Sequence, residues 1–322
     1  MTRQTRYFML GSGAVLVAGL AVGVVAYYGG FPGLAFQANA PAELRYVPED
    51  AVIVGYADVQ EVMRSDFRQK VRSLEPGEAK HGQQEFKDQT GIDIETDIIS
   101  VLAFIRPGDE SEGMVLARGH FDEARIQSFL VSKGASVEQY QGARILSGPH
   151  EAGKKGAVAF LEPGLVAVGS AAAVKGAIDR SKAGAGDILD NPEMLDLINK
   201  VRTDGNAWAV GRFDALAGQA KLPADVMSRI PPMNSFAAAG RINGGISGHL
   251  SIEAKSEEAA KNLTQVVDGF VALARLHLGS NPEQARLFDQ LNLTTQGRNN
   301  TVDISFSVSP ELFDALQAIG KR

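Results

Sequence analysis

The chain has 322 residues, no cysteine, 32 Lys and Arg against 38 Asp and Glu, and a formal net charge of −6. The lack of cysteine excludes disulfides, thiol catalysis, cysteine-ligated zinc and lipidation of an N-terminal cysteine. The acidic balance argues against nucleic acid as a partner and favours a mildly acidic, soluble surface.

The first distinctive segment is an uncharged stretch from Phe8 to Tyr28, FMLGSGAVLVAGLAVGVVAYY. As a helix it would span about 31 Å, enough to cross a hydrocarbon core of roughly 30 Å. It is longer than the apolar core of a cleavable signal peptide, so it predicts a retained transmembrane signal anchor in contact with the lipid bilayer. Arg3 and Arg6 precede it without an acid, which predicts a cytoplasmic tip at residues 1–7. We therefore expect a single-pass protein of the inner (cytoplasmic) membrane with its C-terminal domain outside the cytoplasm, in the periplasm.

Two alternatives concern this N-terminal region. Cleavage near Ala40 would give a secreted protein, although Pro41 directly after the cut disfavours it. Gly19 and Gly23 form a small-xxx-small pair, which could let two anchors pack as a homodimer; the other interpretation is that glycine is simply common in such helices. Residues 29–45 mix Gly, Pro and Ala without a period and are predicted to be a linker.

One device recurs along the rest of the chain. A short strand ends in glycine, a variable residue and a small or aromatic residue follow, and then usually an aspartate begins a helix. The copies are Gly55-Tyr56-Ala57-Asp58, Gly119-His120-Phe121-Asp122 and Gly211-Arg212-Phe213-Asp214, with Gly169-Ser170-Ala171-Ala172 as a weaker one. The aspartate can accept a hydrogen bond from an unpaired amide of the first helical turn, and Ser256 and Ser309 can do the same before two later helices. The recurrence predicts internal repetition.

The order of elements predicts an α+β fold made of two tandem β-α-β-β-α-β-type repeats. The first repeat domain is predicted at 46–181 and the second at 206–322, with a bridging helix and linker at 182–205. Asn243-Gly244 between two apolar runs signals a hairpin. Because the strands are short and alternating, we expect mainly antiparallel sheets with helices packed on one face.

The predicted helix at 257–278 carries an apolar stripe. It consists of Leu263, Val266, Val267, Phe270, Val271 and Ala274. Core packing is the default interpretation of such a stripe, and a groove for lipid or a partner helix is the alternative. Trp208, the only tryptophan, lies in a strand run and is also predicted to be in the core.

No residue is predicted to be catalytic, cofactor-binding or metal-binding, and no cofactor is expected. Neither a nucleophile elbow nor a phosphate loop occurs. The histidines form no HxH or HExxH pair, and each is predicted at the surface, although a metal site assembled from distant residues stays open. They are His81, His120, His150, His249 and His277.

Asp93, Glu95 and Asp97 alternate in the manner of a calcium loop. Ile98 stands where that loop needs glycine for its sharp turn, and no glutamate occupies the twelfth position. The favoured interpretation is therefore that these three acidic residues form a polar segment leading into the following strand.

Four segments resemble a family of uncharacterised bacterial single-pass, envelope-exposed proteins with no assigned activity. They are LRYVPEDAVIVGYADVQEVMRSDFRQKV, GHFDEARIQSFL, AVAFLEPGLVAVGSAAAVKGAID and GNAWAVGRFDAL. The resemblance covers most of the chain beyond the linker and implies a location without an activity.

The anchor and the repeat-built body together predict a non-enzymatic interaction or scaffold module of the bacterial envelope that contacts other envelope proteins. An extracytoplasmic lipid or apolar-ligand binding protein is the first alternative. A hydrolase with an unrecognised Asp/Glu/His site is the second.

Overall fold

The computed structural model describes residues 41–72, 77–107, 113–149, 155–213, 231–278 and 293–309. The strands of the first half are β1 (Ile53–Asp58), β2 (Ile98–Ile105), β3 (Gly113–Gly119), β4 (Ser136–Tyr140), β5 (Ala143–Pro149), β6 (Lys155–Glu162) and β7 (Leu165–Ser170). Those of the second half are β8 (Ala207–Arg212), β9 (Met233–Ile242), β10 (Ile246–Ala254), β11 (Thr294–Arg298) and β12 (Thr301–Val308).

The described helices flank this set of strands. The α-helices are α3 (Val59–Arg64), α4 (Asp66–Arg72), α5 (Gly77–Thr90), α6 (Glu123–Ser132), α7 (Ala171–Ala183), α8 (Pro192–Val201) and α10 (Glu257–Leu278). Two short 3₁₀ helices, η1 (Ala42–Tyr46) and η3 (Ile188–Asp190), complete them. None of the described helices combines the length and the hydropathy that a membrane span requires. The anchor predicted at 8–28 lies outside the described residues.

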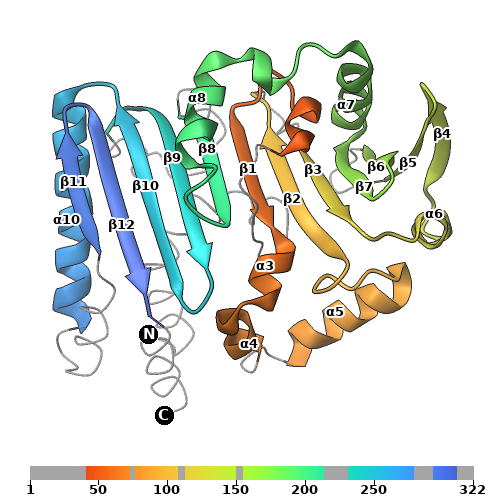
Figure 1. Ribbon diagram of the computed structural model, residues 1–322, viewed down its shortest axis with the longest axis horizontal. Coiled ribbons are helices and arrows are strands. Elements are labelled where there is room, and N and C mark those ends of the chain that lie inside the picture. The colour runs from red at the N-terminus through yellow and green to blue at the C-terminus, as the bar shows by residue number, and fades with distance from the viewer. Residues whose placement is uncertain are drawn as a thin grey trace.

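All twelve strands that the structure describes belong to one sheet, in the order β11-β12-β10-β9-β8-β1-β2-β3-β7-β6-β5-β4, and every neighbouring pair is antiparallel (Figure 1). The mixture of helices and antiparallel strands confirms the α+β class. The halves predicted as separate repeat domains share this sheet, because β1 pairs with β8 at its centre.

The two halves have matching strand orders outward from that centre. The first half runs β1-β2-β3-β7-β6 and the second runs β8-β9-β10-β12-β11. In the central pair, Val54 faces Val210, and the two glycines of the recurring device, Gly55 and Gly211, lie symmetrically about it, since Gly55 faces Ala209 and Gly211 faces Ile53.

Helices cover both faces of the sheet, so the prediction of helices on one face is wrong. On one face, η1, α7 and α8 pack on a core that includes Val54, Leu102 and Val210. On the opposite face, α10 packs on a separate core with Ala209 and Phe236. Alternate residues of one strand therefore serve different cores, because side chains of a strand point to opposite faces. Both faces of the sheet are apolar near its centre, so helices must shield both faces from water.

The end of the predicted linker is part of the core, which corrects its boundary. Residues 42–46 form η1, and Leu44 and Tyr46 are only 1% and 2% exposed. Arg180 of α7 donates to the Tyr46 carbonyl at 2.9 Å, and the Ile188 amide donates to the Val47 carbonyl at 2.8 Å. We call residues 41–50 the lead segment. It is held between α7 on one side and η3 on the other.

The helix starts follow the predicted caps. Asp58 accepts hydrogen bonds from the amides of Gln60 and Glu61, and Asp122 accepts one from Arg125. Ser256 caps α10 as predicted. Ser170 and Asn191, for which no cap was predicted, cap α7 and α8 in the same way. Asp214 and the helix predicted after Ser309 lie outside the described residues.

Three further predictions have outcomes in the structure. Trp208 is 3% exposed, as expected of a core residue, and the Asn243-Gly244 hairpin joins β9 and β10. The stripe on α10 is only partly core: Leu263 is 7% exposed, but Val266 and Phe270 are 38% and 67% exposed.

Candidate functional site

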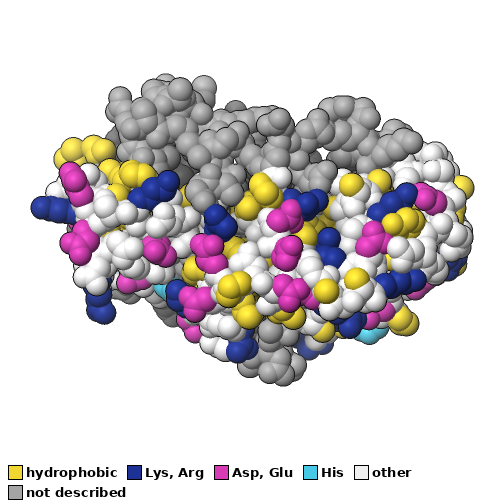
Figure 2. Space-filling model, turned by 90° about the horizontal axis from the view of Figure 1, so that it is seen from above, with side chains coloured by type: hydrophobic (Ala, Val, Ile, Leu, Met, Phe, Trp, Pro, Cys, Tyr) yellow, Lys and Arg dark blue, Asp and Glu magenta, His cyan; other side chains and the backbone are white. Residues whose placement is uncertain are grey.

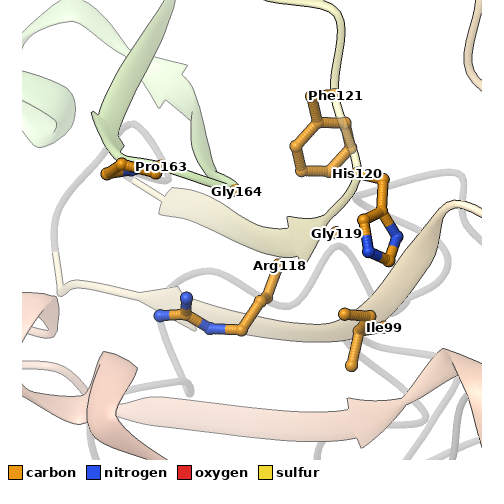
Figure 3. Close-up of a pocket in the computed structure, with 7 residues that line it drawn as sticks. All are labelled: Ile99, Arg118, Gly119, His120, Phe121, Pro163 and Gly164. Carbon is orange, nitrogen blue, oxygen red and sulfur yellow. The ribbon is translucent and has the colours of Figure 1, made fainter.

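A shallow depression of about 490 Å³ lies where β2 and β3 meet the turn between β6 and β7. Figure 3 shows its lining, with His120 and Phe121 following the end of β3 and Pro163 coming from the turn. Ile99, Arg118 and the two glycines Gly119 and Gly164 complete it. The depression is open to solvent, and its surface is mainly apolar.

Two glycines allow β3 and the turn to approach this closely. The Gly119 amide donates to the Gly164 carbonyl at 2.8 Å, and the His120 amide donates to the Asp97 carbonyl at 2.7 Å. A Cβ on Gly119 would clash with the Asp97 carbonyl oxygen. Gly164 has a φ of +74°, a left-handed conformation that glycine adopts without steric penalty. The glycine of the recurring device is thus required here for backbone packing.

Arg118 joins the depression to the lead segment through an ionic cluster. Its Nε donates to Glu43 of η1, and its Nη2 donates to Glu162 at 2.7 Å. Arg45 donates to the other oxygen of Glu162 at 2.7 Å and lies 4.9 Å from the centre of the Tyr46 ring. Hydrogen bonding to Arg118 holds the pKa of Glu162 below its usual value. Two cations and two carboxylates balance in this cluster, so the Arg118 charge is already neutralised and does not make the depression an anion site.

Glu43 is the member of this cluster that depends most on its partner. The residue is 5% exposed although it carries a carboxylate. A buried charge without a partner is strongly unfavourable, so Arg118 is needed to keep η1 seated. In Figure 3 the Arg118 side chain extends along the sheet, away from His120 and Phe121. Its role is therefore to fasten the lead segment.

Asp58 is the carboxyl in this region with the largest change in acidity. Burial raises its pKa to about 7, against hydrogen bonds from Glu61 and Gln60 that lower it. Its strand position pairs with Ser100 of β2, which in turn pairs with Arg118 of β3, so the three lie in one row across the sheet. A carboxyl with a pKa near neutrality can serve as a general acid or base. Here one carboxylate oxygen of Asp58 accepts hydrogen bonds from amides of the helix that the residue caps.

Tyr56 lies two residues before Asp58 on the same face of the sheet. Burial raises the pKa of its hydroxyl to about 12, and its ring stacks on Trp208 with centroids 5.8 Å apart. The phenol stays neutral at physiological pH. The pair joins β1 to β8 by packing, which is a structural contribution.

A second depression of about 250 Å³ lies on the other side of Pro163, between the start of α6 and the β4–β5 hairpin. Glu123 and Arg144 line it, and their charged atoms are 3.7 Å apart. Both side chains are largely exposed, so this pair is screened by water. Neither depression involves α10, beside which the apolar-ligand alternative predicted a cavity.

The structure separates the histidines that it describes. His120 lies exposed at the first depression, whereas His249 of β10 is 3.5 Å from Asp204 in the second half. His150 lies outside the described residues, and the side chains of His81 and His277 are not described. Within the described ranges, no group of three His, Asp or Glu side chains has an arrangement that could hold a metal ion.

The acidic run at Asp93, Glu95 and Asp97 is engaged in local structure. Asp93 accepts from Lys87 at 2.7 Å and from the Glu95 amide at 3.0 Å. Glu95 pairs with Arg68 at 2.8 Å, and Asp97 accepts from the Asp93 amide at 2.7 Å. These bonds close a turn before β2, in agreement with the interpretation as a polar approach to the strand.

Sequence reasoning missed the cluster of Glu43, Arg45, Arg118 and Glu162. Arg45 and Glu162, which pair directly, are 117 residues apart, and no motif relates the four members. The one local signal was the apolar pair Leu44 and Tyr46 beside Glu43, in a stretch that otherwise has the composition of a linker.

Comparison with known proteins places the chain in a family. The model of the family described as "Protein of unknown function (DUF3352)" matches residues 10–265. No curated protein matches the chain. A solved structure titled "Structure of crystal form I of TP0453" is similar at 11% sequence identity and a TM-score of 0.46, over 88% of this chain and 99% of that chain. A likeness at this level supports no inference about function. Because the family model spans well over half of the sequence, the chain belongs to the DUF3352 family of proteins of unknown function.

Proposed function

We propose that this protein is a non-enzymatic interaction module of the bacterial envelope, anchored by residues 8–28 and presenting its sheet outside the cytoplasm to other envelope proteins. The observation that carries the proposal is that the lead segment is buried in the folded body. Leu44, Tyr46 and Val47 are at most 2% exposed, so the chain enters the body through its core.

This seating limits how far the body can lie from the membrane. Twelve residues separate Tyr28, the end of the apolar stretch, from Pro41. Fully extended, they reach at most about 40 Å. The body is therefore held near the bilayer at a fixed attachment point, as expected of a protein whose partners are in or close to the same membrane.

The ionisable groups in and around the depression support a non-enzymatic role. Arg118, Glu43 and Glu162 hold one another, and Asp58 holds a helix start. Among the described residues, the His120 imidazole makes no hydrogen bond or ion pair that would orient it as a base. A hydrolase would need two or three such groups converging on one pocket. An exposed, mainly apolar depression fits contact with a side chain of a protein partner.

We also infer that the two halves descend from one duplicated unit. The matching strand orders and the symmetric placement of Gly55 and Gly211 about Val54 and Val210 support this origin. β4 and β5 would then be additions to the first half, because the second half has no described counterpart for them.

Location and orientation can be tested with cysteine labelling, because the native chain has no cysteine. Gln139→Cys lies at an exposed position of β4. We expect a membrane-impermeant maleimide to label it in spheroplasts and the protein to stay in the membrane after an alkaline carbonate wash. Labelling only after lysis, or release by the wash, would contradict the anchored topology.

The interaction role is tested by crosslinking the full chain in native membranes and purifying it under denaturing conditions. We expect other envelope proteins to be recovered with it, at a constant ratio of partner to this chain. A matched variant, His120→Ala with Phe121→Ala, should lose partners that use the depression. Recovery of this chain alone, as monomer or dimer, would count against the proposal.

A further inference from the structure

The strand β4 forms one edge of the sheet, because among the described strands only β5 pairs with it. Figure 1 shows β4 at the outer right of the sheet. Its residues from Ser136 to Gln139 are all exposed, and the Val137 side chain is 45% exposed. The chain on both sides of β4 is described without a gap from 113 to 149. The outer side of β4 is therefore open to solvent.

The hairpin of β4 and β5 is held in a fixed position. Gln141 and Gly142 have positive φ angles of 47° and 87°, the combination of a two-residue type I′ turn, which sets the register of the two strands. The Tyr140 hydroxyl donates to Asp179 of α7 at 3.0 Å, which fastens the end of β4 to that helix. A strand that is already ordered loses little conformational freedom when a further strand binds to it.

Alternate residues of β4 turn their backbone groups away from β5. In a hairpin with a two-residue turn the closing pair, here Tyr140 and Ala143, exchanges hydrogen bonds, and every second residue counted from it does the same. The amides and carbonyls of Val137 and Gln139 therefore point outward. Among the described residues, no hydrogen bond joins these groups to another segment. We call this row of backbone donors and acceptors the β4 edge.

The β4 edge lacks devices that commonly protect an edge strand. Proteins block such edges with proline, lysine, a β-bulge or a covering element. The sequence of β4, SVEQY, contains neither proline nor lysine. The strand pairs with β5 residue for residue, from Ser136 with Ser147 to Tyr140 with Ala143, without a bulge. The hairpin without a described counterpart in the second half thus ends the sheet in an edge that can accept another strand.

We propose that the β4 edge binds an extended segment of another envelope protein, which continues the sheet as one more antiparallel strand. A row of unpaired backbone donors and acceptors is what an extended peptide satisfies, and strand addition to a sheet edge is a recurring mode of peptide binding. The strand pairs next to the edge, β4 with β5 and β5 with β6, are both antiparallel. An antiparallel segment would form hydrogen-bonded pairs with Val137 and Gln139.

The charge of Glu138 selects among such segments. The residue that faces Glu138 in an added strand comes close enough for the two side chains to interact. The ion pair of Glu138 with Lys175, at 2.8 Å, has exposed members, so water screens it and Glu138 can interact with a second cation. We therefore expect a partner segment with Lys or Arg opposite Glu138 and a β-branched apolar residue opposite Val137.

The same charge disfavours a second copy of this chain as the partner. Two β4 edges use all their outward groups only when a two-fold axis passes through Glu138, so that Val137 of each copy faces Gln139 of the other. Each Glu138 then faces the Glu138 of the other copy, and like charges directly opposite destabilise a strand pair.

The surface around β4 favours recognition through the backbone. Figure 2 shows hydrophobic, acidic and basic side chains intermixed at the end of the molecule where β4 lies. Such a mixed surface offers no large apolar patch as the main contact. The outward backbone groups of Val137 and Gln139 therefore carry the binding, and the side chains add selectivity.

This inference rests on the proposed function and adds a second contact to it. Gln139 also lines the second depression, together with Glu123 and Arg144, so a strand on the β4 edge runs beside that depression. Two outward residues form few hydrogen bonds, which makes the contact weak. Confinement of both proteins to one membrane raises their effective concentration and makes a weak contact effective.

A tethered probe strand tests binding on the purified full chain in detergent. The peptide SVTKVTGGC is joined by a disulfide to Lys133→Cys, an exposed position just before β4, in a chain that has no other cysteine. Bound antiparallel, its lysine lies opposite Glu138. A short tether gives a millimolar effective concentration, so even a millimolar site is about half occupied and amide hydrogen exchange at Val137 and Gln139 slows about twofold or more. The Glu138 amide, which already bonds to β5, should not change.

Two substitutions at one position provide the matched control. Gln139→Pro removes an outward amide, and an edge strand tolerates proline where the amide faces solvent. We expect this variant to abolish the slowing at Val137, whereas Gln139→Ala, which keeps the backbone groups, should retain it. Native protease resistance of both variants checks that the hairpin stays folded. A probe with glutamate in place of its lysine should protect Val137 less.

Photo-crosslinking in native membranes tests for the partner. A photoreactive amino acid replaces Val137 in the full chain. We expect an adduct with another envelope protein, lost in Gln139→Pro and kept in Gln139→Ala. In that protein the crosslinked residue should lie in an extended segment next to Lys or Arg.

The outcomes separate this inference from the proposed function. No slowing of exchange by the probe, an adduct that survives Gln139→Pro, adducts of two copies of this chain alone, or no adduct at all would each overturn strand addition at the β4 edge. If the full chain still crosslinks to other envelope proteins through other positions, the interaction role stands without the β4 edge. Labelling of Gln139→Cys only after lysis would instead overturn the anchored topology, which the probe experiment does not measure.

Discussion

Val54 of β1 faces Val210 of β8 at the centre of the sheet, and both side chains are fully buried. This pair joins the first and second halves of the chain. The core on this face extends across the junction, from Leu116 in β3 to Ala239 in β9. The halves therefore share packing as well as hydrogen bonds.

From this continuity we predict that Val54→Ala destabilises both halves together, so that the protein still unfolds in a single transition. Loss of two methyl groups and the cavity left behind should lower the free energy of unfolding by about 2 kcal/mol. Unfolding followed by Trp208 fluorescence and by far-ultraviolet circular dichroism should shift together. Val168→Ala, at a position that is 41% exposed, is the control and should have a much smaller effect. Separate transitions for the two probes would show that the halves unfold independently.

The lead segment gives a second prediction. Leu44→Ala should lower the free energy of unfolding by roughly 2–5 kcal/mol, because Leu44 is 1% exposed and lies in the main core. Leu189→Ala removes the same side chain at a position that is 46% exposed and should change the free energy by less than about 1 kcal/mol. Equal effects in chemical denaturation would mean that the segment is not seated as described.

Arg118 gives a third prediction. Arg118→Ala leaves the buried Glu43 carboxylate without its partner and should destabilise the protein by about 3 kcal/mol. Adding Glu43→Gln should recover part of this loss, since the buried charge is then removed. Lys200→Ala breaks an exposed pair with Asp196 and should have an effect below about 0.5 kcal/mol. A double variant no more stable than Arg118→Ala would argue against the coupling of Glu43 and Arg118.

The raised pKa of Asp58 predicts how the stability of the protein changes with pH. Burial raises its pKa from 3.8 to about 7 in the folded protein, so the folded state binds the proton more tightly than the unfolded state. Its contribution to stability is greatest below pH 4 and is lost as the pH rises to about 7. Asparagine caps a helix as well as aspartate does and cannot ionise.

We therefore expect Asp58→Asn to remove this slope between pH 4 and 7. At pH 8 the variant should be more stable than the native protein by on the order of 1–2 kcal/mol, because one pKa unit corresponds to about 1.4 kcal/mol and a half-buried group retains part of that value. Asp122→Asn, at a more exposed cap, is the control. A native-like slope in Asp58→Asn, measured by denaturation at several pH values, would assign the pH dependence to another group.

Much of the fold could be predicted from local patterns. The caps at Asp58, Asp122 and Ser256, the Asn243-Gly244 hairpin and the burial of Trp208 each depend on residues close in sequence, and the structure confirms them. The helix α5 was missed because its periodic signal is weak: the described side chains from Gln84 to Gln89 are all exposed.

The candidate site could not be predicted in this way. Glu43 and Arg118 are 75 residues apart, and Arg45 and Glu162 are 117 residues apart. Only the pairing of β3 with β7 and the docking of η1 bring them together. The apolar residues of α10 show the same limit, because an apolar face on a helix does not reveal that the sheet covers Leu263 and leaves Phe270 exposed.

The sequence by itself determined the α+β class, where most of the strands and helices begin, and the prediction of an N-terminal anchor. These features follow from hydropathy, capping and turn chemistry, which act over a few residues. The tertiary structure alone decided that the two halves form one sheet, that the lead segment lies in the core, and that Val266 and Phe270 of α10 are exposed while Leu263 is buried. Those outcomes depend on contacts between distant segments, whose pairing is selected by the combined burial of many side chains.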